Sequence, residues 1–342
     1  MTSATRRTAG WLLACLTTGT SSSAITGDGL QLYGLIDSFA ASIKRSDNLD
    51  RLTVVGSGGL TTPYWGIRGS EDLGGGVKAI FQLEQFFQPD NGRAGRNPTD
   101  PGGFSRSGWA GLSGRFGQLT VGRHTSQYFV SMQIVNPFAA SVVFSPLVVQ
   151  SYMPAFGNTV IGDTVWSNVI QYAAPEVRGL GVTLVLAPGE LAGRSGVYNA
   201  GIHLRYHRGP LNAVLSAQRV RTAAVAPSTG QQAWLAGVSW DAGPANLYAA
   251  VQATENAGTF TRSRTWQLGS AVPVSASGSV LAAWARTGVD NATPDVGLHD
   301  TAALGYDHRL SRRTDLYLTY LYDHIDGRPR GHSYGAGIRH AF

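Results

Sequence analysis

Residues 334–342 read Tyr-Gly-Ala-Gly-Ile-Arg-His-Ala-Phe, and this alternation decides the fold. Successive side chains of an extended strand point to opposite faces, so the larger side chains of the stretch fall on one face and Arg339 falls on the other with small residues. Phe342 is the last residue of the sequence, and an apolar end gains nothing in water, whereas it is stable against lipid. The stretch therefore predicts a strand that closes a barrel in lipid. The alternative is an edge strand of a soluble sheet.

Other segments alternate in the same way. Between residues 198 and 207, Ala200, Ile202 and Leu204 lie between Tyr198 and Tyr206 on one face, and polar residues occupy the other. Residues 211–218 and 315–323 repeat the pattern. Aromatic residues at both ends of an apolar face are typical of the girdles at the two surfaces of a membrane.

The connections between these segments are short and long in turn. The compact, turn-rich ones are residues 71–76, 114–117, 175–179, 208–210, 241–244, 273–277 and 311–314. The longer ones are residues 43–59, 88–103, 125–162, 188–196, 221–231, 255–263, 288–297 and 326–331. Fifteen connections join sixteen strands. The sequence therefore predicts an all-β fold: a transmembrane antiparallel β-barrel of about 16 strands, with short turns at one end and long loops at the other.

Composition supports this architecture and excludes others. Charged residues make up 14% of the chain, Gly occurs 44 times, and no apolar run reaches the roughly 18 residues that a membrane helix needs. The net charge is +6, and Lys44 and Lys78 are the only lysines. The arginines are spread along the chain, whereas nucleic-acid binding requires a concentrated basic face. We therefore expect no nucleic-acid partner.

The first residues have the layout of a secretory signal. Arg6 and Arg7 precede a short apolar segment, and a small polar stretch follows it up to Ala24. We expect residues 1–24 to be a cleaved signal peptide and residues 25–342 to be one barrel domain. The alternative is a lipoprotein in which Cys15 carries the lipid. Under the main interpretation Cys15, the only cysteine, leaves with the signal, so we expect no metal and no cofactor.

Five stretches carry a family resemblance. Residues 65–84 read WGIRGSEDLGGGVKAIFQLE, and LYGLID (32–37), GLSGRFG with VGR (111–117 and 121–123), ALGYD (303–307) and RHAF (339–342) accompany them. In these stretches the chain resembles the general porins of Gram-negative bacteria, especially the β-proteobacterial branch. The resemblance implies a sixteen-stranded homotrimer in the outer membrane, with short periplasmic turns, long extracellular loops and loop three folded into each barrel. It also implies a water-filled pore for passive diffusion of small hydrophilic solutes.

Porins of this kind carry arginines on the barrel wall, facing acidic groups on loop three. Strand parity places Trp65 and Ile67 toward lipid and Arg68 toward the lumen. Arg106 matches a family wall arginine, with Trp109 expected on the lipid side. For both arginines the alternative is a salt-bridged lumen side chain without a role in selectivity.

Three further residues are expected to line the pore. Arg123 in Val121-Gly122-Arg123 is another candidate wall arginine, with the same alternative of a solvated or salt-bridged side chain that has no role in selectivity. Glu84 and Asp37 are expected to point inward, where structural pairing with arginine is their expected role.

The chain departs from the family pattern at the constriction. Tyr64 stands where the family often has a wall arginine, and a second arginine is missing near Val165. Loop three, residues 125–162, contains no Asp, Glu, Lys or Arg. Some relatives carry Pro-Glu-Phe-Gly where this loop has Pro154, Ala155, Phe156 and Gly157. The loop is either packed against the wall or forms an apolar constriction.

These departures predict a weakly anion-selective pore, because the remaining arginines face no loop carboxylates. The alternatives are a substrate-specific channel and a barrel enzyme; no nucleophile motif supports the enzyme. The expected partners are small solutes and anions, outer-membrane lipid and lipopolysaccharide, and the barrel-assembly machinery. By family resemblance that machinery reads an assembly signal made of Tyr334, Ile338 and Phe342.

Overall fold

A computed structural model gives the fold of the protein. It describes residues 29–46, 50–97, 100, 102–190, 192, 198–221, 230–257, 259–291 and 297–342. The expected signal peptide, residues 1–24, and Cys15 lie outside the described residues, as does the side chain of Ala155. No helix among the described residues is long and apolar enough to cross a membrane.

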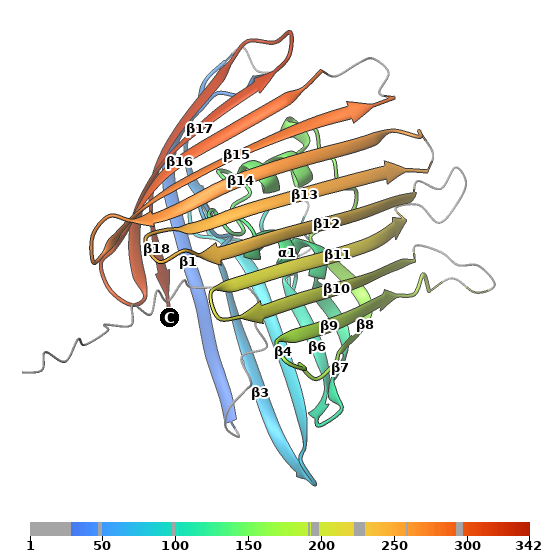
Figure 1. The fold of residues 1–342 in the computed structure, drawn as a ribbon. Helices are drawn as coiled ribbons and strands as arrows, with labels where there is room; N and C mark the ends of the chain where they lie inside the picture. Colours follow the sequence, from blue (N-terminus) through green and yellow to red (C-terminus); the bar gives the residue numbers. More distant parts are fainter. Residues whose placement is uncertain are drawn as a thin grey trace, which may run out of the picture.

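The wall of the molecule is one antiparallel sheet (Figure 1). Its strands are β1 (Gly29–Ile43), β2 (Leu52–Ser57), β3 (Tyr64–Gly74), β4 (Val77–Gln88), β6 (Ser107–Gly114), β7 (Gly117–Thr125), β8 (Val165–Ala173), β9 (Leu180–Ala187), β10 (Asn199–Arg208), β11 (Leu211–Arg221), β12 (Gly230–Asp241), β13 (Asn246–Asn256), β14 (Arg262–Pro273), β15 (Gly278–Asp290), β16 (His299–Arg309), β17 (Thr314–Ile325) and β18 (Gly331–Ala341).

The sheet closes on itself between β1 and β18. Their register runs from Leu35 opposite Ala341 to Ser42 opposite Tyr334. β2 and β3 pair with successive parts of β1 and form one wall strand that is interrupted at residues 58–63. β5 (Arg93–Ala94) is a short addition to β4 in the following loop. In the described part of the chain this gives a closed barrel of 16 strands, so the predicted fold class is confirmed.

The connections fall at the two ends of the barrel as predicted. Compact turns join β3 to β4, β6 to β7 and β10 to β11, and the longer segments lie at the opposite ends of the strands. The Ala341 amide donates to the Arg313 carbonyl oxygen at 2.8 Å, beside the turn between β16 and β17. The end of β18 therefore lies at the end of the barrel that carries the short turns.

The two faces of the wall differ in chemistry. Large apolar side chains point outward and are exposed, among them Trp266, Leu268 and Leu318. Tyr334, Ile338 and Phe342 share this outer face, on which Phe342 is 42% exposed. The inner face buries polar residues such as Gln252, Thr265 and Thr301. An apolar exterior around a polar interior is the arrangement that a barrel in lipid requires.

Candidate functional site

A long connection between β7 and β8, residues 126–164, folds into the barrel (Figure 1). It contains α1 (Gln127–Ile134), α2 (Pro146–Tyr152) and η1 (Pro154–Phe156). This is the predicted loop three. α1 contacts β10, β11 and β12, and α2 contacts β14, β15 and β16. The helices of loop three therefore lie along one side of the lumen, and the wall made by β3, β4 and β6 remains on the other side of the passage.

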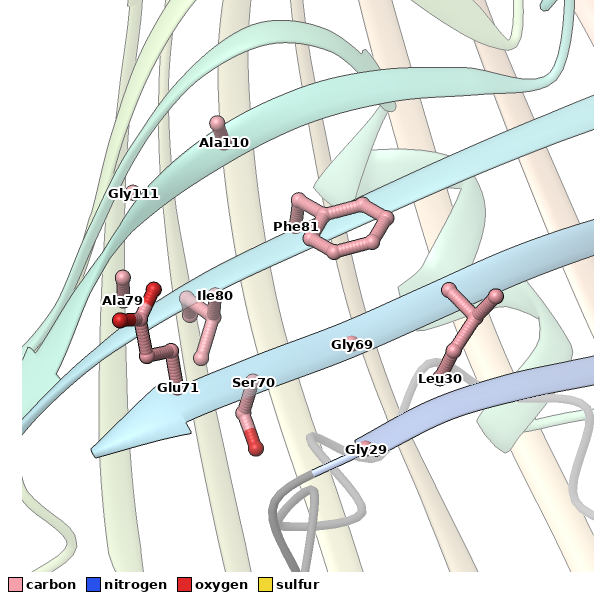
Figure 2. Close-up of a pocket in the computed structure, with 10 residues that line it drawn as sticks. All are labelled: Gly29, Leu30, Gly69, Ser70, Glu71, Ala79, Ile80, Phe81, Ala110 and Gly111. Carbon is pink, nitrogen blue, oxygen red and sulfur yellow. The ribbon is translucent and has the colours of Figure 1, made fainter.

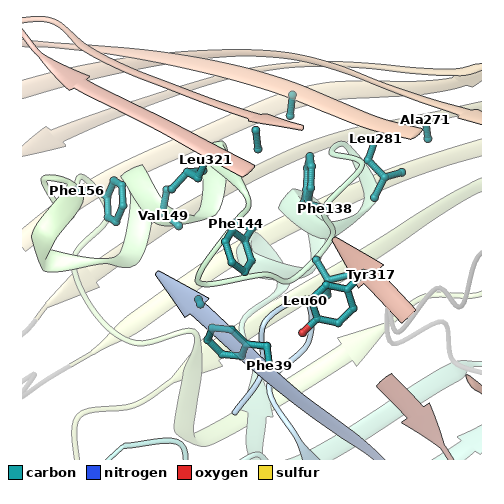
Figure 3. Close-up of a cluster of buried hydrophobic side chains, with 13 residues drawn as sticks. Phe39, Leu60, Phe138, Phe144, Val149, Phe156, Ala271, Leu281, Tyr317 and Leu321 are labelled. Atoms are coloured by element: carbon teal, nitrogen blue, oxygen red, sulfur yellow. The ribbon is translucent and has the colours of Figure 1, made fainter. Parts of the chain in front are cut away.

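Apolar side chains of loop three pack against the inner wall in two clusters. Tyr128, Met132 and Leu147 pack with Val214 and Leu235 of the wall. The second cluster joins Phe138, Phe144 and Phe156 to Phe39, Tyr317 and Leu321 (Figure 3). The rings of Phe39 and Phe144 meet edge to face, with centroids 6.0 Å apart. Most of the large apolar side chains are thus buried against the wall, which is the first of the two alternatives for this loop.

The four residues predicted to form the constriction have different environments. Phe156 is buried, and its ring stacks on His299 with centroids 6.0 Å apart, while the Arg45 guanidinium lies 5.3 Å from the ring centroid. Pro154 and Gly157 are exposed. The side chain of Ala155 lies outside the described part of the chain. A role for these residues in the constriction stays a prediction.

Neutral polar groups hold loop three to the wall. The Gln150 amide nitrogen donates to the His299 carbonyl oxygen at 3.1 Å and to the Thr301 hydroxyl at 2.8 Å, and its oxygen accepts from Thr287 at 2.6 Å. Gln231 of β12 accepts from the Ile161 amide at 3.0 Å. The sequence analysis missed these anchors. The sequence feature that could have indicated them is the series of Gln and Thr residues at the inward-facing positions of β12 to β16.

Asp37 organises the segment on which the tip of loop three rests. Its carboxylate accepts from the Leu60 and Thr61 amides at 2.8 and 2.7 Å and from the Tyr317 hydroxyl at 2.5 Å. Ser141 of loop three donates to the Gly59 carbonyl oxygen at 2.6 Å. Asp37 points inward as expected, but no arginine in the described structure forms an ion pair with it. Backbone amides and a phenol hold this carboxylate, and Arg339 lies opposite Asp37 in the register of β1 and β18 without an ion pair, so a structural role with arginine stays a prediction.

Glu84 and Arg106 form an ion pair on the opposite wall. The Tyr33 hydroxyl also donates to Glu84, at 2.7 Å, and the Arg106 guanidinium lies 3.9 Å from the centroid of the Tyr64 ring. The side chains of Arg106 and Glu84 are only 12% and 3% exposed. Tyr64, in the position of a missing arginine, therefore packs against the arginine that remains.

Arg106 enters the lumen for a different reason from the one expected. Trp109 pairs with Gln82 and Ser107 pairs with Glu84, so Trp109 lies on the inner face. It stacks on His124 with an interplanar angle of 9°. The expected outward position of Trp109 is wrong. Arg106 precedes β6 and turns inward at a bend, where its amide donates to the Glu84 carbonyl oxygen at 3.1 Å.

Arg68 faces the lumen as strand parity predicts. Its Nε donates to the Gln31 side-chain oxygen at 2.9 Å, and its guanidinium lies 4.8 Å from the centroid of the Tyr33 ring. No carboxylate in the described structure is within ion-pair distance of Arg68. Arg68 therefore keeps an uncompensated positive charge.

Arg123 occupies the other face of the wall. It pairs with Gly108, and the next residues of that face are Ala110 and the exposed Val121. Its guanidinium donates to the Ser105 carbonyl oxygen at 2.7 Å and to the Ser167 hydroxyl at 2.6 Å. The expected inward position of Arg123 is wrong, because the register of β6 and β7 carries the side chain outward.

A charged contact lies where loop three returns to the wall. Arg96 contacts both oxygens of Asp163, at 2.8 and 2.5 Å, and Asp100 at 3.1 Å. Burial raises the pKa of Asp163, but the hydrogen bonds and charge of Arg96 outweigh burial and hold this pKa below its usual value. Asp163 is therefore ionised at neutral pH and links loop three to the segment before β6.

A closed antiparallel barrel with an apolar exterior and an inward-folded loop defines a class of protein, the outer-membrane channels. The family model described as Gram-negative porin matches residues 10–328. The chain belongs to this family. Outer membrane porin protein 32 of Delftia acidovorans is 30% identical over 318 residues, which cover 90% of this chain and 87% of the relative. An outer membrane porin protein of Bordetella pertussis is 26% identical and covers 97% of this chain and 99% of the relative.

Solved structures agree with this assignment. The chain superposes on a structure described as an anion-selective porin from Comamonas acidovorans with a TM-score of 0.78 and 26% identity, covering 92% of this chain and 99% of that one. OmpT of Vibrio cholerae, at 13% identity and a TM-score of 0.70, shares the fold. The protein is an outer-membrane porin, and porins are channels.

Proposed function

We propose that the passage beside loop three is weakly selective for anions and that small hydrophilic solutes diffuse through it passively. The observation that carries the proposal is the uncompensated Arg68 on the uncovered wall, together with the absence of any charged side chain from residues 125–162 of loop three. The nearby inner carboxylates are buried and bonded: Asp37 is 0% exposed and Glu84 is 2% exposed. A positive potential concentrates anions in a narrow passage. The similar structure described as an anion-selective porin also supports a preference for anions.

The zero-current potential across a planar bilayer tests this proposal. In a gradient of potassium chloride, the purified protein is expected to give a zero-current potential whose sign shows that chloride permeates more readily than potassium. Clear potassium preference would overturn the proposal. Saturable, solute-blockable current would favour the second candidate, a substrate-specific channel, over simple diffusion. The proposal assigns no catalysed reaction to the chain.

We also propose that the protein assembles as a homotrimer through the outer face of β1, β3, β4 and β6. A groove of about 300 Å³ lies on this face, where Gly69, Ala79 and Ala110 leave space between Leu30 and Phe81 (Figure 2). Small residues that open a groove on an otherwise apolar surface permit close approach of another subunit. One solved relative is described in a trimer form, which supports this proposal.

Lipid contact belongs on the opposite outer face. Arg219 and Arg264 are exposed there, near the loop ends of β11 and β14, and Arg262 pairs with Glu255 at 2.9 Å. Guanidinium groups bind phosphate with two parallel hydrogen bonds, so these side chains suit the phosphates of lipopolysaccharide. Arg264→Gln is expected to lower the lipopolysaccharide that co-purifies with the protein. Unchanged co-purification would contradict the assignment.

Two sequence expectations remain part of the proposal. Residues 1–24 would direct the chain to the export machinery and be removed. Phe342, with Tyr334 and Ile338, would be read by the barrel-assembly machinery from the outer face of β18. The exposure of the three side chains on one face supports this role.

A further inference from the structure

A row of hydrogen-bond donors lies on the inner wall, one step from the Glu84–Arg106 pair toward the short turns. Gln31 of β1 is opposite Arg68 of β3, Arg68 is opposite Gln82 of β4, and Gln82 is opposite Trp109 of β6. We call these four residues the Arg68 row. The next row toward the loops contains Glu84 and Ser107. A solute that passes the ion pair therefore reaches the Arg68 row next.

The Arg68 row is partly exposed to the lumen, whereas Glu84 of the ion pair is buried. Glu84 and Ser107 are each 2% exposed, while Arg68, Gln82 and Trp109 are all partly exposed. The hydrogen bond between Arg68 and Gln31 is exposed, whereas the Arg106 side chain is only 12% exposed, so Arg68 is the more accessible of these two arginines, although Arg106 has the better match to the family pattern.

The donors of the Arg68 row remain available to a solute. The Nε atom of Arg68 donates a hydrogen bond to Gln31, and the guanidinium lies against the Tyr33 ring, so the orientation of the side chain is fixed. The two terminal nitrogens of Arg68 have no hydrogen-bond partner in the described structure. The Gln82 amide and the Trp109 indole N–H likewise have no hydrogen-bond partner among the described residues. A guanidinium with two free nitrogens forms paired hydrogen bonds with a carboxylate.

Trp109 adds a flat apolar surface to the same row. Its ring is held parallel to the His124 ring, with centroids 5.4 Å apart. Two strand spacings, about 10 Å, separate the backbones that carry Arg68 and Trp109. This spacing suits an anion whose carboxylate meets Arg68 while a ring extends toward the indole, because aromatic rings prefer stacked or edge-to-face contact.

We propose that the Arg68 row is a binding site for aromatic monocarboxylates within the passage. The proposal rests on the proposed function, because the ligand reaches the row only through an open channel. Arg68 binds the carboxylate, Gln82 donates a further hydrogen bond, and Trp109 contacts the ring. An aliphatic carboxylate of similar charge lacks the ring contact and binds more weakly.

Single-channel recording with benzoate and acetate tests the site. Benzoate added on the side of the short turns is expected to reduce the chloride current in a saturable way, and acetate to do so only at higher concentration. Arg68→Gln is expected to raise the half-blocking benzoate concentration by about tenfold or more, because a charge-assisted hydrogen bond is lost. Trp109→Leu is expected to make the half-blocking concentrations of benzoate and acetate nearly equal, while both anions still block the current to some extent.

Arg309→Gln is the matched control, since it removes one arginine from the inner face of β16 outside the row. It is expected to leave the benzoate block unchanged. Normal potassium chloride conductance in each variant shows that the barrel has folded. Equal block of the parent protein and Arg68→Gln would overturn the site. A channel that conducts with cation preference would instead overturn the proposed anion selectivity, and absence of any conductance in the parent would overturn the channel itself.

Discussion

At the scale of single residues, Arg106 acts chiefly by neutralising Glu84. Both side chains are nearly buried and in contact. Replacing Arg106 with Gln leaves a carboxylate without its counter-charge beside the passage, so we expect the selectivity to move toward cations. A screened interaction of about 1 kcal/mol corresponds to a change of roughly fivefold in relative permeability. The zero-current potential in a salt gradient measures this change.

The paired variant separates charge from packing. Arg106→Gln combined with Glu84→Gln removes both charges, so its selectivity is expected to return close to that of the parent. If the single variant keeps the anion preference of the parent, Glu84 does not influence the permeating ions.

Gly34 and Phe342 form the other residue-scale contact with a testable role. The Gly34 amide donates to the Phe342 carbonyl oxygen at 3.1 Å, and the Phe342 amide donates back to Gly34 at 3.0 Å. A Cβ atom at Gly34 would lie 2.5 Å from the Phe342 ring and 2.7 Å from the Tyr64 carbonyl oxygen. Any side chain at Gly34 therefore displaces the ring or the strand.

We expect Gly34→Val and deletion of Phe342 to lower the yield of folded barrel by a large factor. Heat-modifiable gel mobility measures that yield, and the surviving pores should keep the parent conductance. Gly181→Val is the control, because the nearest atom to a Cβ at Gly181 is 3.9 Å away. Normal assembly without Phe342 would contradict its role as an assembly signal.

The residues of the passage were only partly predictable from the sequence. The alternation of side chains along a strand correctly placed Arg68, Glu84 and Asp37 on the lumen side, because these residues lie within regular strands. It failed for Trp109, whose face was inferred from Arg106 as if no bend preceded β6. It also could not show that Tyr64 and Tyr33 pack against Arg106 and Arg68, because such contacts depend on the register between strands distant in sequence.

At the scale of elements, loop three has no charged side chain between residues 125 and 162, and buried amides and hydroxyls hold it to the wall. Gln150 is 0% exposed and makes bonds to β15 and β16. Gln150→Leu removes the hydrogen bonds to the Thr301 and Thr287 hydroxyls, which keep Asp323 and Thr265 as partners, so each lost bond is expected to cost about 0.5–1.5 kcal/mol. We expect a more mobile loop and therefore greater noise in the open-channel current at constant voltage.

Gln133→Leu on α1 is the matched control, since Gln133 is partly exposed and has no hydrogen-bond partner in the described structure. Its current noise should equal that of the parent. Equal noise in Gln150→Leu would show that the apolar clusters alone fix loop three.

The elements of the wall follow from the sequence more directly than loop three does. Alternating residues and turn-rich connections specify strands through local chemistry. The break at residues 58–63 was not predicted, because its cause is remote: Asp37 of β1 binds the backbone of Leu60 and Thr61. The anchoring of loop three was also missed, since it joins Gln150 to strands more than a hundred residues away.

At the scale of the whole molecule, the two outer faces differ in the partner they suit. The groove between Leu30 and Phe81 suits another subunit, so Ala110→Trp, which fills it, is expected to convert most of the proposed trimer to monomer. Analytical ultracentrifugation in detergent measures this change. Ala282→Trp, on the outer face of β15 opposite the exposed Leu304, is expected to stay trimeric. A stable trimer with Trp at position 110 would exclude this face as the interface.

Closure of the sheet has a consequence for how the protein unfolds. An open sheet can lose its edge strand first, but this wall has no edge. Among the described wall strands, with β2 and β3 taken as one, β1 and β18 are the neighbours that come from opposite ends of the chain. Separating β1 from β18 would break the pairing of eight residues on each strand, including Asp37 opposite Arg339. Amide protons throughout the wall should therefore exchange with solvent in one cooperative opening, and not in a gradient from a fraying edge.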